Sequence, residues 1–162
     1  MAISGGFSSS ELLDQEHELV LPISDVFDLL EIGEIGKTLG FIRKLPIAIE
    51  IKLENWIMYH ISLPGSNPEN NFWIRRKSNV VMLKKHSSLY ERINAEDQSI
   101  DWFKLNKVNE VDYAIHGGSL PLITQNYKFI GTLTISGMTH VADHLFGVEI
   151  LTNYLNGRRA LR

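Results

Sequence analysis

The sequence predicts an α+β domain, in which helices pack against an antiparallel sheet of about five strands. Segments 46–63 and 117–136 have the pattern of β-hairpins, because apolar residues alternate on both sides of a turn signal. Longer segments with apolar residues at helical spacing lie before, between and after these hairpins. Strands joined by hairpins pair antiparallel, so the predicted sheet is antiparallel rather than built from β-α-β units.

The N-terminal third predicts one long helix after two short elements. Residues 11–15 suit a weak helical turn, and residues 17–23 suit an extended segment. Ser24 is the expected N-cap of a helix that runs to about residue 44. Its apolar residues recur at helical spacing: Val26, Leu29, Ile32, Ile35, Leu39 and Ile42. Glycine costs a helix about 1 kcal/mol relative to alanine, so close packing on the sheet is expected at three positions: Gly33, Gly36 and Gly40.

The first hairpin starts after Pro46 and turns at Glu54-Asn55, and residues 56–63 form its second strand. Its first strand alternates between an apolar face and a small or charged face. These faces are Ile47, Ile49, Ile51 and Leu53 on one side, and Ala48, Glu50 and Lys52 on the other.

Two helices are expected over residues 71–85 and 87–95, followed by a polar, mobile segment at 95–99. The apolar residues of the first are Phe72, Val80, Val81 and Leu83. The second hairpin pairs 117–124 with 128–136 around Asn126, and a closing helix covers 142–155 and ends at Gly157. Its expected inward residues are Leu145, Val148, Ile150, Leu151 and Leu155. This order of elements fits a profilin-like α/β layer.

Composition limits the classes of function. The chain has 162 residues, 44% hydrophobic and 22% charged, which suits one globular domain. A net charge of −3 provides no basic field for nucleic acid, and no cysteine is present for disulfides, thiolate metal sites or nucleophiles. The apolar runs are shorter than a membrane span, and no signal peptide is recognisable, so a cytoplasmic location is expected. The expected division is a disordered lead-in at 1–10, a single domain at 11–157 and a solvated tail at 158–162.

The segment from Asn70 to Lys77 combines an aromatic residue with three consecutive cations. One or two of these cations could face a carboxylate or a phosphate, since guanidinium and ammonium groups bind both. Trp73 could stack on a flat ligand or on a partner. The alternative is a solvated charged helix face with Trp73 in the core.

Two further motifs combine hydroxyls, histidine and glycine. Ser87 and Ser88 either cap the following helix, which is the commoner role, or bind an oxyanion; no G-x-S-x-G elbow supports a serine nucleophile. The glycines of His116-Gly117-Gly118 allow a ligand to approach the backbone, with His116 as acid, base or ligand. The alternative is a turn into a strand with a hydrogen-bonded histidine.

His140 and His144 are spaced four residues apart, a spacing at which two helical histidines can share a metal. His140 falls at the expected start of the helix, however, and no glutamate follows it. A capping role for Asp143, with His144 packed in the core or at a ligand pocket, is therefore favoured. Neither G-x-G-x-x-G nor G-x-x-x-x-G-K-[ST] occurs, so phosphate loops are unsupported.

Taken in order, these motifs resemble the HbpS/GlcG-like superfamily, in its uncharacterised cytosolic branch, whose members are often labelled heme-degrading domain proteins. The resemblance runs from about residue 15 to residue 155. One departure is Leu120, where the family has phenylalanine before the proline. The motifs are Leu63-Pro64-Gly65-Ser66, Glu69-Asn70, Trp73-Ile74, Arg76-Lys77, Ser87-Ser88, Tyr113-Ala114, His116-Gly117-Gly118, Thr134-Ile135-Ser136-Gly137 and Asp143-His144.

The resemblance implies a profilin-like fold, homo-oligomers built from dimers, and binding of heme or a related small molecule. It also implies that the motif residues form one ligand site or subunit interface. The candidate ligand-binding residues are Asn70, Trp73, Arg76, Lys77, Ser87, Ser88, His116, Gly117, Gly118, Asp143 and His144.

Three functions remain open on this basis. The leading one is a cytoplasmic binding protein for a small planar anionic ligand, with heme as the named candidate. His116 or His144 would then supply the axial nitrogen, while Arg76 and Lys77 meet the propionates. The second is a protein-interaction or chaperone-associated adaptor whose motif residues build the oligomer. The third is an enzyme that uses His116 or the Asp143-His144 pair as acid and base, with no catalytic residue assigned.

Overall fold

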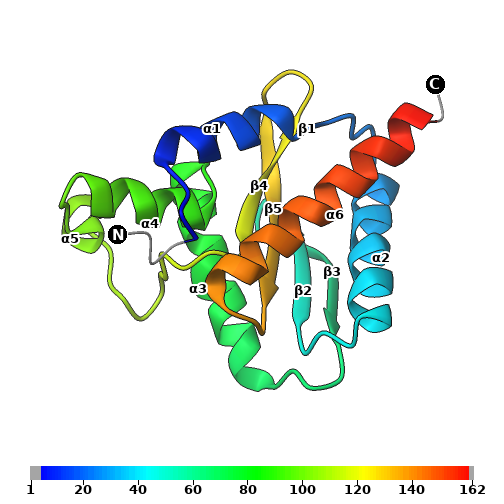
Figure 1. Cartoon of the computed structure of the whole chain (residues 1–162), viewed down its shortest axis with the longest axis horizontal. Helices are drawn as coiled ribbons and strands as arrows, with labels where there is room; N and C mark the ends of the chain where they lie inside the picture. The colour runs from blue at the N-terminus through cyan, green and yellow to red at the C-terminus, as the bar shows by residue number, and fades with distance from the viewer. Residues whose placement is uncertain (1–4, 161–162) are drawn as a thin grey trace.

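The computed structural model of the chain describes residues 5–160, without the side chains of the last two of these, and contains one five-stranded sheet between helices (Figure 1). Residues 1–4 of the expected lead-in and 161–162 of the expected tail lie outside the described residues. The elements in chain order are α1 (Ser9–Glu18), β1 (Val20–Leu21), α2 (Val26–Ile42), β2 (Ala48–Leu53), β3 (Trp56–Ser62), α3 (Pro68–Lys84), α4 (Ser88–Asp97), α5 (Trp102–Asn106), β4 (Ser119–Thr124), β5 (Phe129–Ser136) and α6 (His140–Ala160).

The sheet has the strand order β1-β4-β5-β2-β3. Both predicted hairpins are present, and β5 pairs antiparallel with β2 to join them. The prediction of an entirely antiparallel sheet is wrong at one edge, because β1 pairs with β4 in parallel through Val20 and Leu21. No hairpin connects these two strands, so the alternation in the sequence contains no information about their relative direction.

The main hydrophobic core lies between one face of the sheet and helices α2 and α6. It includes three residues of the predicted apolar strand face, all fully buried: Ile47, directly before β2, and Ile49 and Ile51 within it. The glycines of α2 allow the close packing that the sequence predicted. A Cβ on Gly36 would lie 2.8 Å from Ile150 Cδ1 and 3.0 Å from Ile49 Cδ1. The helix therefore approaches both the sheet and α6 where a larger side chain would not fit.

The other face of the sheet is more polar, and it is covered in part by α3. Lys52 Nζ on β2 donates to Ser78 Oγ on α3 at 3.2 Å. Ser119 Oγ and Thr134 Oγ1 share a hydrogen bond of 2.8 Å across β4 and β5. Buried polar groups of this kind must be paired, and they fix how α3 lies on the sheet.

Several helix boundaries differ from the prediction, because local capping decides where helices begin. Helix α1 is a full helix of 10 residues, rather than a weak turn, and Ser8 caps it. The N-cap of α2 is Asp25 rather than Ser24, which donates to Asp28 instead. Helix α3 begins at Pro68, since Asn67 and Asn70 form a reciprocal capping box. The expected lead-in at 1–10 therefore includes the N-cap Ser8 and the first two residues of α1.

Leu145, expected to point inward, is 44% exposed. Two of the apolar residues expected in the helix at 71–85 are also exposed, namely Phe72 (62%) and Leu83 (44%). Helical spacing identifies a face of a helix, but the neighbours decide how much of that face is covered.

Three expectations about the C-terminus and the segment at 95–99 differ from the structure. Helix α6 continues through Gly157, where a Cβ would meet nothing within 4 Å. Arg158, expected in a solvated tail, pairs with Asp28 at 2.6 Å and with Glu31 at 2.7 Å. Helix α4 extends to Asp97, into the segment expected to be mobile. The short helix α5 was not predicted. Its buried Trp102 joins it to α4, because the indole N–H donates to Glu91 Oε1 at 2.9 Å.

Within residues 5–160, no helix combines the length and apolarity needed to span a bilayer.

Candidate functional site

A pocket of about 360 Å³ opens where α3, the loop before β4 and the start of α6 meet. This volume lies toward the lower end of the range for small-molecule sites. Asn70, Trp73 and Lys77 reach it from one face of α3, since positions three and seven residues apart share a helix face. The complete lining is Asn70, Trp73, Lys77, His116, Ser136, Gly137, Met138, His140 and Asp143.

A buried ion pair between Lys77 and Asp143 forms the floor of the pocket. Lys77 Nζ donates to Asp143 Oδ2 at 3.1 Å, to the carbonyl of Gly117 at 3.0 Å and to that of Ile135 at 2.9 Å. The other carboxylate oxygen of Asp143 accepts from the backbone N–H of Met138 at 3.0 Å. All three ammonium protons and both carboxylate oxygens therefore have partners, as a buried charged pair requires.

Burial opposes ionisation of both members of this pair. It raises the pKa of Asp143, while Lys77 and the N–H of Met138 act in the opposite direction. Burial likewise lowers the pKa of Lys77, and Asp143 opposes that shift. Because every donor and acceptor of the pair is satisfied, we assign the charged form to both. Their charges cancel at the floor, and the pair contributes no free charge to a ligand.

Gly118 allows this arrangement because it lies at a φ of +135°, where other residues are strained. A Cβ at this position would lie 2.5 Å from the carbonyl oxygen of Ile135 and 2.5 Å from Lys77 Nζ. At Gly117, a Cβ would collide with the carbonyl of His140. The glycine pair therefore lets the loop before β4 lie against Lys77 and α6, rather than against a ligand.

Two half-buried imidazoles, His116 and His140, form the wall of the pocket. Their ring centroids are 5.6 Å apart and the planes are nearly perpendicular, at 87°. The Trp73 ring packs edge-on against His116 at 5.0 Å. Burial, together with the nearby Arg92 and His140, lowers the pKa of His116 to about 4. Burial also lowers the pKa of His140. Since the ordinary value is about 6.5, both rings are neutral at pH 7.

The unused polar groups of the pocket are mainly donors. Neither Nε2 of the two imidazoles has a hydrogen-bond partner among the described residues, and the same holds for the indole N–H of Trp73. The guanidinium of Arg76 lies over the Trp73 ring at 4.8 Å. It donates to the carbonyl of Glu110 at 2.6 Å, but it pairs with no carboxylate in the part of the chain described. The N–H of Gly117 donates to His140 Nδ1, and Arg92 Nη1 lies 3.5 Å from His116 Nδ1, so we assign the single proton of each neutral ring to Nε2. With that assignment, the site presents neutral N–H donors beside one uncompensated positive charge.

The structure brings some of the predicted site residues together. Five of them line the pocket: Asn70, Trp73, Lys77, His116 and Asp143. Gly117 and Gly118 contact Lys77 at its floor, and the guanidinium of Arg76 lies over the ring of Trp73, which lines the pocket.

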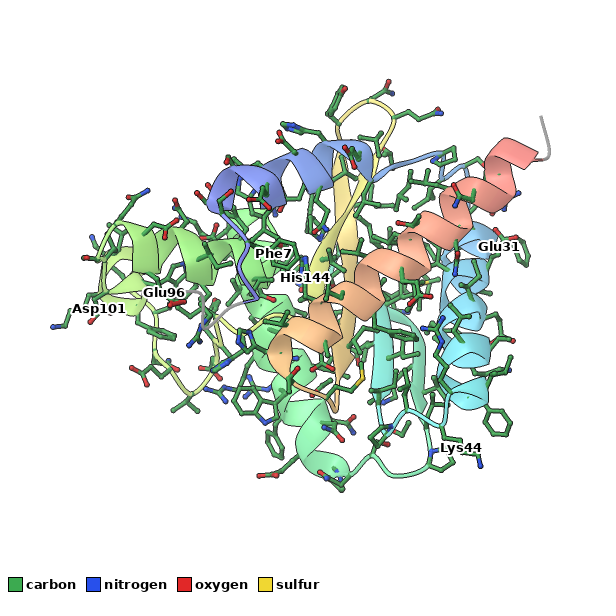
Figure 2. All side chains as sticks on the ribbon, in the orientation of Figure 1. Phe7, Glu31, Lys44, Glu96, Asp101 and His144 are labelled. Atoms are coloured by element: carbon green, nitrogen blue, oxygen red, sulfur yellow. The ribbon has the colours of Figure 1, made fainter. Side chains whose placement is uncertain are left out.

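Three predicted residues lie elsewhere. Ser87 caps α4 by accepting from Tyr90 N at 3.1 Å, and Ser88 Oγ accepts from Ser119 N at 3.1 Å. His144 is fully buried, with Nε2 2.7 Å from Gln15 Oε1 and its ring 6.1 Å from that of Phe7 (Figure 2). It therefore faces α1 and the N-terminal segment, and it is not among the residues that line the pocket.

Asp143 and His144 do not form an acid-base pair, because the Asp143 carboxylate is engaged by Lys77 and Met138. His140 and His144, considered as an i,i+4 metal pair, have different neighbours: His140 Nδ1 accepts from the N–H of Gly117, and His144 Nε2 lies 2.7 Å from Gln15 Oε1. No group of three or more histidine, aspartate or glutamate side chains in the described residues is placed to hold a metal ion.

The list of candidate residues omitted four that line the pocket: Ser136, Gly137, Met138 and His140. The first two belong to a motif that the sequence analysis singled out, but they were not included among the candidate ligand-binding residues. His140 was considered as a metal ligand together with His144. Its neighbour in the pocket is instead His116, which is 24 residues away in sequence and comes close only through the fold.

The chain belongs to the family described as haem degrading protein HbpS-like, which matches residues 28–152. It is similar to a UPF0303 protein of Streptomyces avermitilis, with 31% identity over 145 residues that cover 90% of this chain and 89% of that protein. A UPF0303 protein of Rhizobium rhizogenes is 36% identical over 130 residues, covering 78% and 80% respectively. The family assignment confirms the resemblance drawn from the motifs.

Solved structures agree with the fold. The crystal structure of the Ybr137w protein has a TM-score of 0.84 and 27% identity, and the match covers 93% of this chain and 89% of that chain. A crystal structure of PduOC in complex with heme has a TM-score of 0.64 and 13% identity, with 80% and 95% covered. A double mutant of Streptomyces reticuli HbpS also has a TM-score of 0.64, at 9% identity, with 82% and 87% covered. At these low identities, the last two show a shared fold.

Proposed function

We propose that this chain binds a small planar molecule that carries a carboxylate, and that the pocket between α3 and α6 is the binding site. The observation that carries this proposal is the set of unpaired N–H groups on His116, His140 and Trp73 beside the uncompensated charge of Arg76. A carboxylate only accepts hydrogen bonds, so it complements a wall made of donors. The Trp73 ring offers the apolar surface that a flat ligand needs.

The alternatives to an anionic ligand fit less well. A cation would meet Arg76 without a free carboxylate to balance it, because Asp143 is already paired with Lys77. A purely apolar ligand would leave three N–H donors without partners, and unsatisfied buried donors are costly. The charge and the hydrogen-bonding groups therefore both favour an acidic ligand.

Heme is the candidate that the family description and the heme complex of PduOC suggest. It belongs to the proposed class, because it combines a flat ring with two propionate groups. Trp73 would face the ring, and Arg76 would face a propionate. When bound, heme would supply the redox chemistry of its iron. The pocket is open at its mouth, so a ligand larger than its volume would extend beyond it.

A matched pair of small ligands tests the proposed class without heme. We expect 2-naphthoate to bind saturably and to change the fluorescence of Trp73, while neutral 2-naphthalenemethanol binds at least about tenfold more weakly. Arg76→Gln should remove most of this difference, and His17→Ala, at an exposed position on α1, should leave it unchanged. Equal affinity for the acid and the alcohol would contradict the proposal.

Self-association is a second proposal, favoured by apolar side chains on the outer face of α2. Phe41 is 66% exposed and Ile42 is 71% exposed, and both flank a groove of about 450 Å³ between α2 and the edge strand β3. Exposed apolar clusters of this kind are typical of protein interfaces. Such an interface would agree with the homo-oligomers expected from the resemblance. We also keep the cytoplasmic location expected from the sequence as part of the proposed function.

A further inference from the structure

We infer that His116 and His140 bind a ligand oxygen through their Nε2–H groups, and that neither ring ligates iron. This inference rests on the proposed function, and it specifies how the pocket holds its ligand. The argument depends on which nitrogen of each ring carries the proton. In a neutral imidazole one nitrogen donates and the other accepts, and the local hydrogen bonds decide which.

The proton of His140 is placed by the backbone of the glycine loop. The N–H of Gly117 donates to His140 Nδ1 at 3.1 Å. Nδ1 must therefore carry the lone pair, and the single proton of the neutral ring lies on Nε2. The Nε2 atom belongs to a ring that lines the pocket, and it has no partner among residues 5–160.

The proton of His116 is placed by a cation. Arg92 Nη1 lies 3.5 Å from His116 Nδ1, and it donates to the carbonyl of Ile115 at 3.2 Å. A guanidinium N–H facing Nδ1 favours a lone pair at that atom and disfavours a second N–H. The proton of this neutral ring is therefore also on Nε2.

Iron ligation requires the opposite arrangement. A histidine that binds a metal through Nε2 uses the lone pair of that atom, and it donates its Nδ1–H to a carbonyl, a carboxylate or water. Here, Nδ1 of both rings faces an N–H donor. Moving the proton to Nδ1 would place two N–H groups against each other, and at His140 it would break the bond from Gly117. His116 and His140 therefore do not have the protonation that an axial iron ligand requires.

The same arrangement suits a carboxylate. With ring centroids 5.6 Å apart, the two imidazoles are close enough for both oxygens of one carboxylate to accept from them. Neither ring is charged at pH 7, so the positive charge comes from Arg76, whose guanidinium lies 4.8 Å from the centre of the Trp73 ring. For heme, this means that the propionates, rather than the iron, would meet the histidines.

The test compares hemin with metal-free protoporphyrin, which has the same propionates and no iron. We expect dissociation constants within about threefold of each other, and a bound hemin spectrum without the bands of histidine-ligated iron. His116→Ala and His140→Ala should each weaken both ligands by about tenfold or more, since a hydrogen bond to a charged group is lost. Glutamine keeps an N–H donor near the position of Nε2, so His116→Gln and His140→Gln should recover most of the affinity.

Opposite results separate this inference from the proposed function. A histidine-ligated spectrum that is lost in His116→Gln or His140→Gln, with hemin far tighter than protoporphyrin, would overturn the inference and leave the proposed binding site standing. If the wild-type chain binds neither porphyrin nor 2-naphthoate, the proposed function fails and the inference fails with it. Circular dichroism of each variant establishes that it is folded, and His17→Ala controls for the loss of a histidine elsewhere.

Discussion

Lys77 is the residue on which the geometry of the site depends most. It joins α3 to the glycine loop through Gly117, to β5 through Ile135 and to α6 through Asp143. The sequence indicated that one or two of three consecutive cations would face a ligand. The structure separates them: Arg75 pairs with Asp112 at the surface, while Lys77 is buried under the pocket. Its neighbours, rather than its residue type, give it a structural role.

Removing the ammonium of Lys77 should leave the Asp143 carboxylate buried without a counter-charge. We expect Lys77→Met to lower the free energy of unfolding by about 3–5 kcal/mol, the usual cost of breaking a buried ion pair from one side. Urea denaturation followed by circular dichroism measures this change. The double variant Lys77→Met with Asp143→Leu should recover part of the loss, because no charge is then left unpaired. A loss below about 1 kcal/mol in the single variant would show that the pair is not buried as described.

The buried His144 should make the free energy of unfolding depend on pH. Burial lowers its pKa from 6.5 to about 4 in the folded chain. Between these two values the unfolded chain binds more protons, so the free energy of unfolding falls as the pH is lowered from about 6.5 to about 4. The slope from one such group is at most about 1.4 kcal/mol per pH unit. His86 acts in the opposite direction, because Glu16 raises its pKa and its contribution is lost as the pH rises.

Urea midpoints measured between pH 7.5 and pH 4.5 isolate the contribution of His144. The His144→Gln variant should have a flatter dependence than the wild type, whereas His17→Gln should keep the wild-type slope. Identical slopes for all three proteins would show that His144 does not remain neutral on folding.

Among the elements, the loop before β4 could be identified in the sequence by its glycine pair, but its structural role could not be predicted. The sequence allowed either a ligand against the backbone or a turn into a strand. The structure shows the turn, with the side chain of Lys77 in the space that a Cβ on Gly118 would take. The same sequence is compatible with both alternatives, since a glycine indicates only that another group approaches the backbone closely.

A pair of glycine-to-alanine changes tests this role. Gly118→Ala should destabilise the chain by more than about 2 kcal/mol, because the new Cβ meets the carbonyl of Ile135 at a φ that alanine rarely adopts. Gly157→Ala should instead stabilise it by about 0.5–1 kcal/mol, since this glycine lies inside α6 with open space around it. Thermal and urea unfolding of both variants provide the comparison, and a neutral Gly118→Ala would count against the described loop.

At the scale of the whole molecule, we expect the chain to self-associate at micromolar concentration. Multi-angle light scattering should give a mass above that of the 18.4 kDa chain. If the groove beside α2 is the interface, the paired changes Phe41→Asp and Ile42→Asp should lower the measured mass. Phe27→Asp, at a residue of α2 that is also exposed, serves as the matched control. A wild-type monomer would contradict the expectation, and a mass unaffected by the paired changes would place the interface elsewhere.

The sequence by itself determined most elements of this protein and their class. Alternation and helical spacing are local properties, so two hairpins, the long helices and the small-residue contacts of α2 could be predicted from them. The ordered motifs also identified the family. The tertiary structure alone decided the parallel pairing of β1 with β4, the separation of His144 from the pocket and the meeting of His116 with His140. These features depend on contacts between distant parts of the chain, and on which hydrogen-bond donor faces each ring. Neither the long-range contacts nor these donors can be predicted from a local sequence pattern.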